Sequence, residues 1–150
     1  MGSAYAQPAK GKYYRFLNQK YNKVMNENWS SQDVTCNTVD DDDYTQVWMY
    51  TSTGALQNVY TGRYIQDQSG TSATFKTGAA PQSVSFTKMS DGHYYLQTNG
   101  HGLHCDAAQN VVRWDDQGNE GNHWTVKEVA LTADEVKAIR EEFTYLSGLR

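Results

Sequence analysis

The chain has 150 residues, enough for one domain whose core needs no disulfide or metal to stabilise it. Aromatic residues make up 13% of it, and because disordered chains lack aromatics, the composition excludes extended disorder. The net charge is -4 and the 13 basic residues are scattered, which argues against a nucleic-acid partner. No apolar run approaches the roughly 18 residues of a membrane-spanning helix.

The first eleven residues are interpreted as a tag remnant and an N-terminal tail. Residues 1–3 are typical of a tag, and Ala4-Tyr5-Ala6 has the small-x-small form of a signal-peptidase site. The apolar segment that precedes such a site is absent. The pattern predicts an exported protein with a secreted, periplasmic or cell-surface location.

Short β-rich segments alternate with turns along most of the chain. Turn-forming pairs such as Asp91-Gly92 and Asn99-Gly100 recur about every 8–12 residues, and there are only two prolines. This spacing predicts an all-β barrel or sandwich of about twelve strands. Strands are expected at residues 13–17, 46–50, 62–65, 72–75, 84–86, 94–96, 111–114 and 124–129.

The end of the chain breaks this rhythm. Thr132 and Glu135 have the spacing of a capping box at a helix start, and Gly148 suits the residue after a helix. Between them one apolar stripe is formed at helical spacing by Val136, Ile139, Phe143 and Leu146. Residues 131–150 are therefore predicted to form an amphipathic helix. It either packs on the barrel or begins a further domain.

A degenerate motif recurs three times, and its third position falls at residues 48, 84 and 124, which are 36 and 40 residues apart. Such a period indicates an architecture built from similar units. The units are expected at about residues 12–54, 55–92 and 93–129, with about four strands each. The three motif copies are Gln46-Val47-Trp48, Gln82-Ser83-Val84 and Asn122-His123-Trp124.

These repeats, each ending in a Gln-x-Trp-like motif, resemble the ricin-B-like lectin domain over residues 12–129. The resemblance implies a β-trefoil, in which six strands form a barrel and three hairpins cap it. It also implies that Trp48, Val84 and Trp124 belong to the shared core. The motif amides Gln46 and Gln82 are then expected to fix local backbone.

The resemblance implies one sugar site per copy, built from an Asp, an aromatic ring and an amide. In the third copy these correspond to Asp106, Trp114, Asn119 and Asn122. An aromatic face stacks on sugar C–H groups, while a carboxylate accepts hydroxyl hydrogens. The second copy has Gln66 in place of the acid. The first copy is expected to carry no site, because it has Asn26 at that place and no aromatic between positions 29 and 44.

The sequence carries no catalytic signature such as G-x-S-x-G or H-E-x-x-H. No metal and no cofactor are expected, because the His101 to Asp106 cluster and the four-residue acidic run at 40–43 lack ligand spacing. Cys36 and Cys105 are either one bridge between copies or two buried thiols.

We therefore expect a non-catalytic module that binds a glycan or polysaccharide within a larger exported protein. The alternative is a protein-interaction or structural β-trefoil in which Asp106 caps a turn and Trp114 joins the core. In that case fold would persist without sugar binding.

Overall fold

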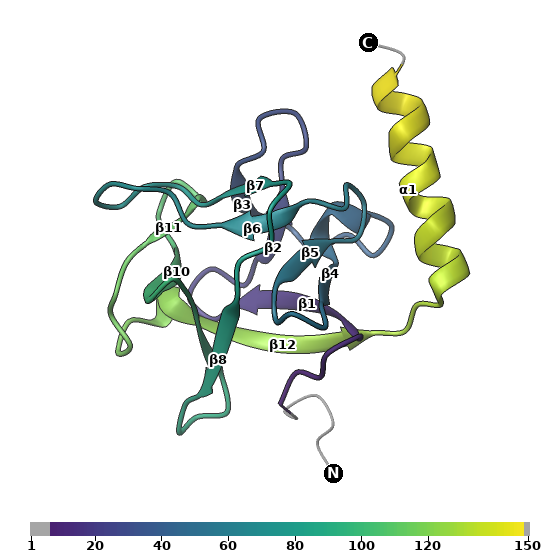
Figure 1. Ribbon diagram of the computed structural model, residues 1–150. Helices are drawn as coiled ribbons and strands as arrows, with labels where there is room; N and C mark the ends of the chain where they lie inside the picture. The colour runs from purple at the N-terminus through teal and green to yellow at the C-terminus, as the bar shows by residue number, and fades with distance from the viewer. Residues whose placement is uncertain (1–6, 149–150) are drawn as a thin grey trace.

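The computed structural model describes residues 7–148, so the tag and signal-peptidase interpretations for residues 1–6 lie outside the described residues. The described chain forms twelve strands, two short 3-10 helices and one α-helix (Figure 1). Their bounds are β1 (Tyr13–Asn18), β2 (Val24–Glu27), β3 (Val34–Asn37), η2 (Tyr44–Gln46), β4 (Trp48–Tyr50), β5 (Leu56–Asn58), β6 (Tyr64–Gln66), β7 (Lys76–Gly78), β8 (Val84–Lys88), β9 (Tyr94–Thr98), β10 (His101–Cys105), β11 (Val111–Arg113), η3 (Glu120–Asn122), β12 (His123–Val129) and α1 (Ala133–Gly148).

Six strands close into a barrel. β12 pairs with β1, β1 with β4, β4 with β5, β8 with β9, and β9 with β12, all antiparallel. The gap between β5 and β8 is bridged by Ala55 and Ser83, with the Val84 amide donating to the Gly54 carbonyl at 2.7 Å. The ring is therefore complete, and no barrel strand is left with an open edge.

The other six strands form three hairpins, one for each copy: β2–β3, β6–β7 and β10–β11. Each hairpin bridges to both others, through residue pairs that link all three copies. The bridging pairs are Asp33 with Lys76, Thr74 with Val112, and Thr35 with Asn110. A six-strand barrel capped by three mutually linked hairpins is a β-trefoil, so the fold prediction of an all-β trefoil with a C-terminal helix is confirmed.

The buried core repeats the three-fold pattern of the sequence. Trp48 and Trp124 are completely buried, and each indole Nε1 donates to a carbonyl of its own copy's hairpin at 3.0 Å, Met25 for one and Leu103 for the other. Val84 is also buried, at the same point of the second copy. The Val84 side chain is smaller than an indole. Tyr50 lies next to it, and the Tyr50 hydroxyl donates to the Val84 carbonyl at 3.4 Å.

One strand prediction in the second hairpin is wrong. The sequence predicts a strand at residues 72–75, but β7 begins at Lys76. Phe75 is fully buried, and its amide donates to the Val111 carbonyl at 2.8 Å. It therefore lies at the junction between the second and third hairpins. The β6–β7 ladder starts only after that junction, where Gln66 pairs with Lys76.

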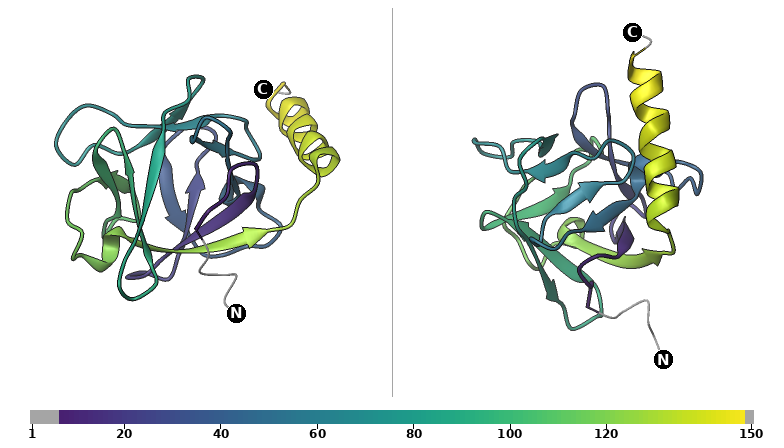
Figure 2. Two further views of the ribbon diagram at one scale, coloured as in Figure 1. Left: turned by 60° about the horizontal axis from the view of Figure 1, so that its bottom comes forward. Right: turned by 45° about the vertical axis from the view of Figure 1, so that its right-hand side comes forward.

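The C-terminal helix α1 lies alongside the barrel in both Figure 1 and Figure 2. The predicted capping box is present: the Glu135 amide donates to Thr132 Oγ1 at 3.1 Å, and the Thr132 amide donates to Glu135 Oε1 at 2.8 Å. Val136 packs with Val47 and Val59 in a small second apolar cluster. The predicted apolar stripe is not buried along its whole length, because Leu146 at its end is 43% exposed.

The two cysteines are both buried free thiols. A hydrogen bond with the Cys105 thiol, together with burial, raises the pKa of Cys36 far above its ordinary value. The Cys36 thiol is therefore not an activated nucleophile. Their contact joins the first and third hairpins.

Candidate functional site

Trp114 follows β11 directly and leaves its indole 46% exposed at the surface. Its backbone is held on both sides, since its amide donates to the Gly102 carbonyl at 3.2 Å and its carbonyl accepts from Asn122 Nδ2 at 2.6 Å. The ring centroid lies 6.1 Å from that of His104. The fixed backbone and the flanking ring orient the partly exposed indole.

Trp114 borders a hollow of about 220 Å³, here called the Trp114 hollow, which also includes the 70–72 segment of the second copy. His101 and Asp115 line it as a pair, with 3.1 Å between His101 Nδ1 and Asp115 Oδ2. The Gly102 amide donates to Asp115 Oδ1 at 2.7 Å. That bond, followed by the bond with His101, lowers the pKa of Asp115, so its carboxylate is charged at neutral pH.

Gly102 is required by this arrangement. A Cβ at position 102 would lie 2.6 Å from the Trp114 carbonyl oxygen and 2.6 Å from the Tyr95 hydroxyl. Both contacts are too close for any side chain. The missing side chain therefore lets the chain of Trp114 and Asp115 pass directly over β10.

Asp106 lies apart from the Trp114 hollow. Its Oδ1 accepts from the amides of Ala108 and Asn110, both at 3.0 Å, which caps the turn between β10 and β11. Cys105 pairs with Val111 at this closed end of the hairpin. Trp114 follows the other end, so the structure does not bring the two predicted side chains together.

The two amide side chains predicted for the third site form hydrogen bonds with backbone groups. Asn119 caps η3, with its Oδ1 accepting from the Gly121 amide at 2.8 Å. Asn122 is fully buried and donates to the Trp114 carbonyl, while its Oδ1 accepts from His104 Nδ1 at 2.8 Å. Of the four residues predicted for the third site, Trp114 alone lines the hollow.

The motif amides of the other copies also bind backbone groups. Gln46 Oε1 accepts from the Asp40 amide and its Nε2 donates to the Thr38 carbonyl, both at 2.9 Å. Gln82 Oε1 accepts from the Asp67 amide at 2.7 Å. Gln46 therefore fixes the loop that precedes its own motif, whereas Gln82 fixes the start of the loop between β6 and β7.

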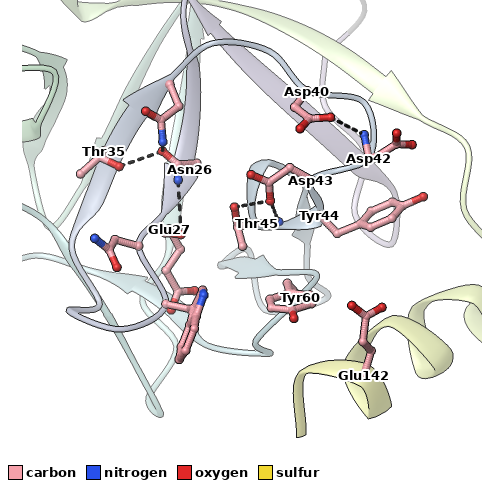
Figure 3. Close-up of a pocket in the computed structure, with 13 residues that line it drawn as sticks. Asn26, Glu27, Thr35, Asp40, Asp42, Asp43, Tyr44, Thr45, Tyr60 and Glu142 are labelled. Atoms are coloured by element: carbon pink, nitrogen blue, oxygen red, sulfur yellow. Dashed lines mark hydrogen bonds between the residues drawn. The ribbon is translucent and has the colours of Figure 1, made fainter. Parts of the chain in front are cut away.

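A second, larger hollow of about 480 Å³ lies in the first copy, and we call it the first-copy hollow (Figure 3). One wall is formed by polar side chains of β2 and β3. Asn26 Oδ1 accepts from Thr35 Oγ1 at 2.7 Å and from Asn37 Nδ2 at 3.1 Å. This wall offers amide and hydroxyl groups that are already oriented by one another.

The opposite wall comes from the loop before η2. Asp40 and Asp42 lie at its rim, and Asp43 caps η2 by accepting from the amide and the hydroxyl of Thr45, at 3.0 and 2.6 Å. Figure 3 shows Tyr44 on this side and Tyr60 between Thr45 and Glu142. The hollow thus combines aromatic rings with carboxylates, which is the combination that the sequence places only in the third copy.

Glu27 is the buried acid beside this hollow, and none of its side chain is exposed. Its carboxylate accepts from Thr61 Oγ1 at 2.6 Å and from Arg63 at 2.8 Å. The same Arg63 nitrogen donates to the Trp29 carbonyl at 2.7 Å. A buried charge requires such partners, and Glu27 is therefore part of the scaffold.

Two kinds of feature are absent from residues 7–148. In that range no group of three or more His, Cys, Asp or Glu side chains is arranged to hold a metal ion. No helix there is long and apolar enough to cross a membrane.

The comparisons with known proteins agree with the fold. No protein-family model matches the sequence, and no curated protein is significantly similar to it. The chain superposes on the Macrolepiota procera ricin B-like lectin in complex with lactose with a TM-score of 0.71, at 14% identity over 83% of this chain and 100% of that one. It superposes on a designed three-fold symmetric protein with a TM-score of 0.67, at 17% identity over 78% of this chain and 99% of that one.

An enzyme also contains a similar unit. The chain matches an exo-β-1,3-galactanase from Clostridium thermocellum with a TM-score of 0.66, at 19% identity over 82% of this chain and 31% of that chain. At these identities the likeness defines the fold. The protein has a ricin-B-like β-trefoil fold.

Proposed function

We propose that the protein is a non-catalytic carbohydrate-binding module whose ligand is a glycan or polysaccharide. The observation that carries this proposal is the exposed Trp114 indole, fixed at the edge of a hollow whose other side chains are polar. A tryptophan placed in this way has lost the burial that usually stabilises it. Stacking on the C–H face of a sugar would restore that burial.

The groups around Trp114 suit a sugar ring. Asp115 is ionised and accepts hydroxyl hydrogens, while His101 and Arg113 offer donors on the same hollow. Arg113 is itself fixed, because its guanidinium donates to the Gly70 carbonyl at 2.7 Å and lies 2.9 Å from Asp67. In this proposal Asp115 has the role that the sequence suggests for Asp106.

The first-copy hollow is proposed as a second site for the same class of ligand. It offers oriented amides at Asn26 and Asn37 and rings at Tyr44 and Tyr60. One shallow sugar site binds with about millimolar affinity, near −4 kcal/mol. Two sites on one chain would raise the affinity for a polymer through multivalency.

We also propose that the chain is one module of a larger exported protein. The small-x-small pattern at residues 4–6 supports export. The galactanase that it matches over 31% of that chain supports a modular setting, since there a unit of this fold is one part of a longer polypeptide. Any catalytic domain would then lie elsewhere in the parent protein.

Trp114→Ala is expected to remove sugar binding at the Trp114 hollow, because the stacking surface is lost while the polar groups remain. The full chain is first screened on a glycan array. The best-binding neutral oligosaccharide is then titrated into isotope-labelled protein by NMR. In the parent the Trp114 indole N–H signal and the amide signals of His101 and Asp115 should shift. In the variant those two amide signals should stay unchanged.

Tyr145→Ala is the matched control, since it removes an aromatic side chain that is 68% exposed on α1. It should leave the shifts at His101 and Asp115 as in the parent. The buried indoles of Trp48 and Trp124 report that each variant is folded. Shifts of the His101 and Asp115 amides that persist in folded Trp114→Ala would show that the Trp114 indole is not required for binding at this hollow. An array on which no glycan binds the parent would favour the protein-interaction or structural alternative.

A further inference from the structure

The helix α1 lies outside the three copies, yet it is held against the first-copy hollow. Arg140 Nε donates to the Val59 carbonyl at 3.2 Å. The Arg140 side chain also covers Gly62, where a Cβ would lie 3.5 Å from its Nε. These contacts, together with Val136, fix the first half of α1 on the loops that surround the hollow.

Phe143 fixes the second half of α1. Its ring centroid lies 5.8 Å from that of Trp29 in an edge-on arrangement and 5.0 Å from that of Tyr60. The Arg63 guanidinium lies 5.5 Å from the same ring. Aromatic pairs and cation–π contacts of this kind prefer defined geometries, so Phe143 sets the rotation of α1 about its axis.

Glu142 precedes Phe143 and is the α1 residue that lines the first-copy hollow. Figure 3 shows its side chain extending from α1 towards the side of Tyr44 and Tyr60. After burial, the charges of Glu142 and Asp43 are the causes that raise the pKa of Tyr60. The charge of the Glu142 carboxylate therefore acts inside the hollow, on the Tyr60 side chain that lines it.

The charged side chains that line this hollow are all acidic. Arg63 neutralises Glu27, but the described residues that line the hollow include no Lys, Arg or His. An acidic ligand would therefore meet carboxylates on both the loop side and the helix side. Like charges brought together at a binding surface suppress the wrong partner.

We propose that α1 completes the first-copy hollow, with Glu142 as a specificity-determining residue that discriminates against acidic glycans and Phe143 as its positioning residue. The inference rests on the proposed function, since it requires that the first-copy hollow binds sugar. The favoured ligands are neutral glycans, whose hydroxyl groups donate to the Glu142 carboxylate. Glycans that carry uronic acid, sialic acid or sulfate groups are disfavoured.

The test compares Glu142→Gln with Glu141→Gln, which removes the same charge from the neighbouring position of α1 that does not line the hollow. Both are made in the Trp114→Ala background, so that binding comes from the first-copy hollow. Each protein is applied to an array of matched pairs, neutral oligosaccharides beside their uronic-acid or sulfated counterparts. Glu142→Gln should reduce the preference for the neutral member by about three- to tenfold, and Glu141→Gln should leave it unchanged.

Phe143→Ala should reduce that preference in the same way, because Glu142 loses its fixed position. Leu146→Ala, on the exposed end of the same helix, should not. A purely structural role of Phe143 would lower the melting temperature without changing the preference between matched glycans.

Two outcomes overturn the inference, and they differ. Equal preferences in Glu142→Gln and Glu141→Gln, with neutral glycans still bound, would show that α1 does not select the ligand although the hollow binds sugar. If no neutral glycan binds in the Trp114→Ala background, the proposed sugar site in the first copy is itself wrong.

Discussion

Trp124→Ala is expected to lower the free energy of unfolding by about 3–5 kcal/mol. The indole is completely buried at the junction of β12 with the third hairpin, and its Nε1 donates to the Leu103 carbonyl at 3.0 Å. The change removes apolar burial, leaves a cavity that the closed barrel cannot fill, and leaves the Leu103 carbonyl without this donor. Urea denaturation followed by far-UV circular dichroism measures the loss.

The control for this prediction is Trp114→Ala, which deletes the same side chain at a position that is 46% exposed. Its effect on stability should stay within about 0.5 kcal/mol, as for most surface substitutions. Equal losses at positions 114 and 124 would mean that burial in the shared core does not explain the role of the motif tryptophan.

The trefoil was predictable because its core positions recur at nearly constant spacing. Phe16, Leu56 and Leu96 are fully buried and lie 40 residues apart. Asn18 and Asn58 repeat at the same spacing, and each donates from Nδ2 to a carbonyl beside the motif of another copy, Asn18 to Gly121 at 2.9 Å and Asn58 to Thr45 at 2.8 Å. Residues that fill the same place in a pseudo-symmetric core must keep both spacing and character, and a sequence displays both.

The start of β7 was not predictable from the same pattern. Residues 72–75 have the composition of a strand, but a three-residue strand offers too little alternation to define its first ladder pair. Phe75 shows what decides the outcome. It is drawn into the junction with Val111 of the third hairpin, which is a contact between copies.

The polar residues of the third site show a second limit. Asp106 and Asn119 have residue types that either face a ligand or accept from nearby backbone amides, and both do the latter here. The spacing of these residues in the sequence is the same whether they face a ligand or accept from backbone amides. The exposed position of Trp114 and the hydrogen bond of Asp115 with the Gly102 amide depend on how β10 begins and how β11 ends.

The first-copy hollow depends on contacts that no local motif encodes. The sequence has Asn26 at the place of the acid and no aromatic residue between positions 29 and 44, and the expectation of no site in the first copy followed from both. In the structure the rings that line the hollow come from Trp29 and Tyr44, at the two edges of the gap, and from Tyr60 in the next copy, while α1 adds Glu142. Residues so far apart in sequence carry no shared spacing.

Arg63→Ala is expected to destabilise the protein by about 3–5 kcal/mol, because it leaves the fully buried Glu27 carboxylate without its charged partner. Thr61 alone would then hold that charge, through the hydrogen bond at 2.6 Å. The cation–π contact with Phe143 would be lost as well, so α1 should loosen. Thermal and urea denaturation measure the first effect, and amide hydrogen exchange of residues 133–148 measures the second.

Lys76→Ala is the matched control, since the Lys76–Asp33 pair has the same 2.8 Å separation but side chains that are 46% and 35% exposed. Its cost should be at most about 1 kcal/mol, because water screens exposed pairs. The decisive comparison adds Glu27→Gln to Arg63→Ala. Removing the stranded charge should restore part of the lost stability, since a neutral amide is less costly to bury than an unpaired carboxylate. A double variant less stable than Arg63→Ala alone would show instead that Arg63 stabilises the protein mainly through its contacts with Trp29 and Phe143.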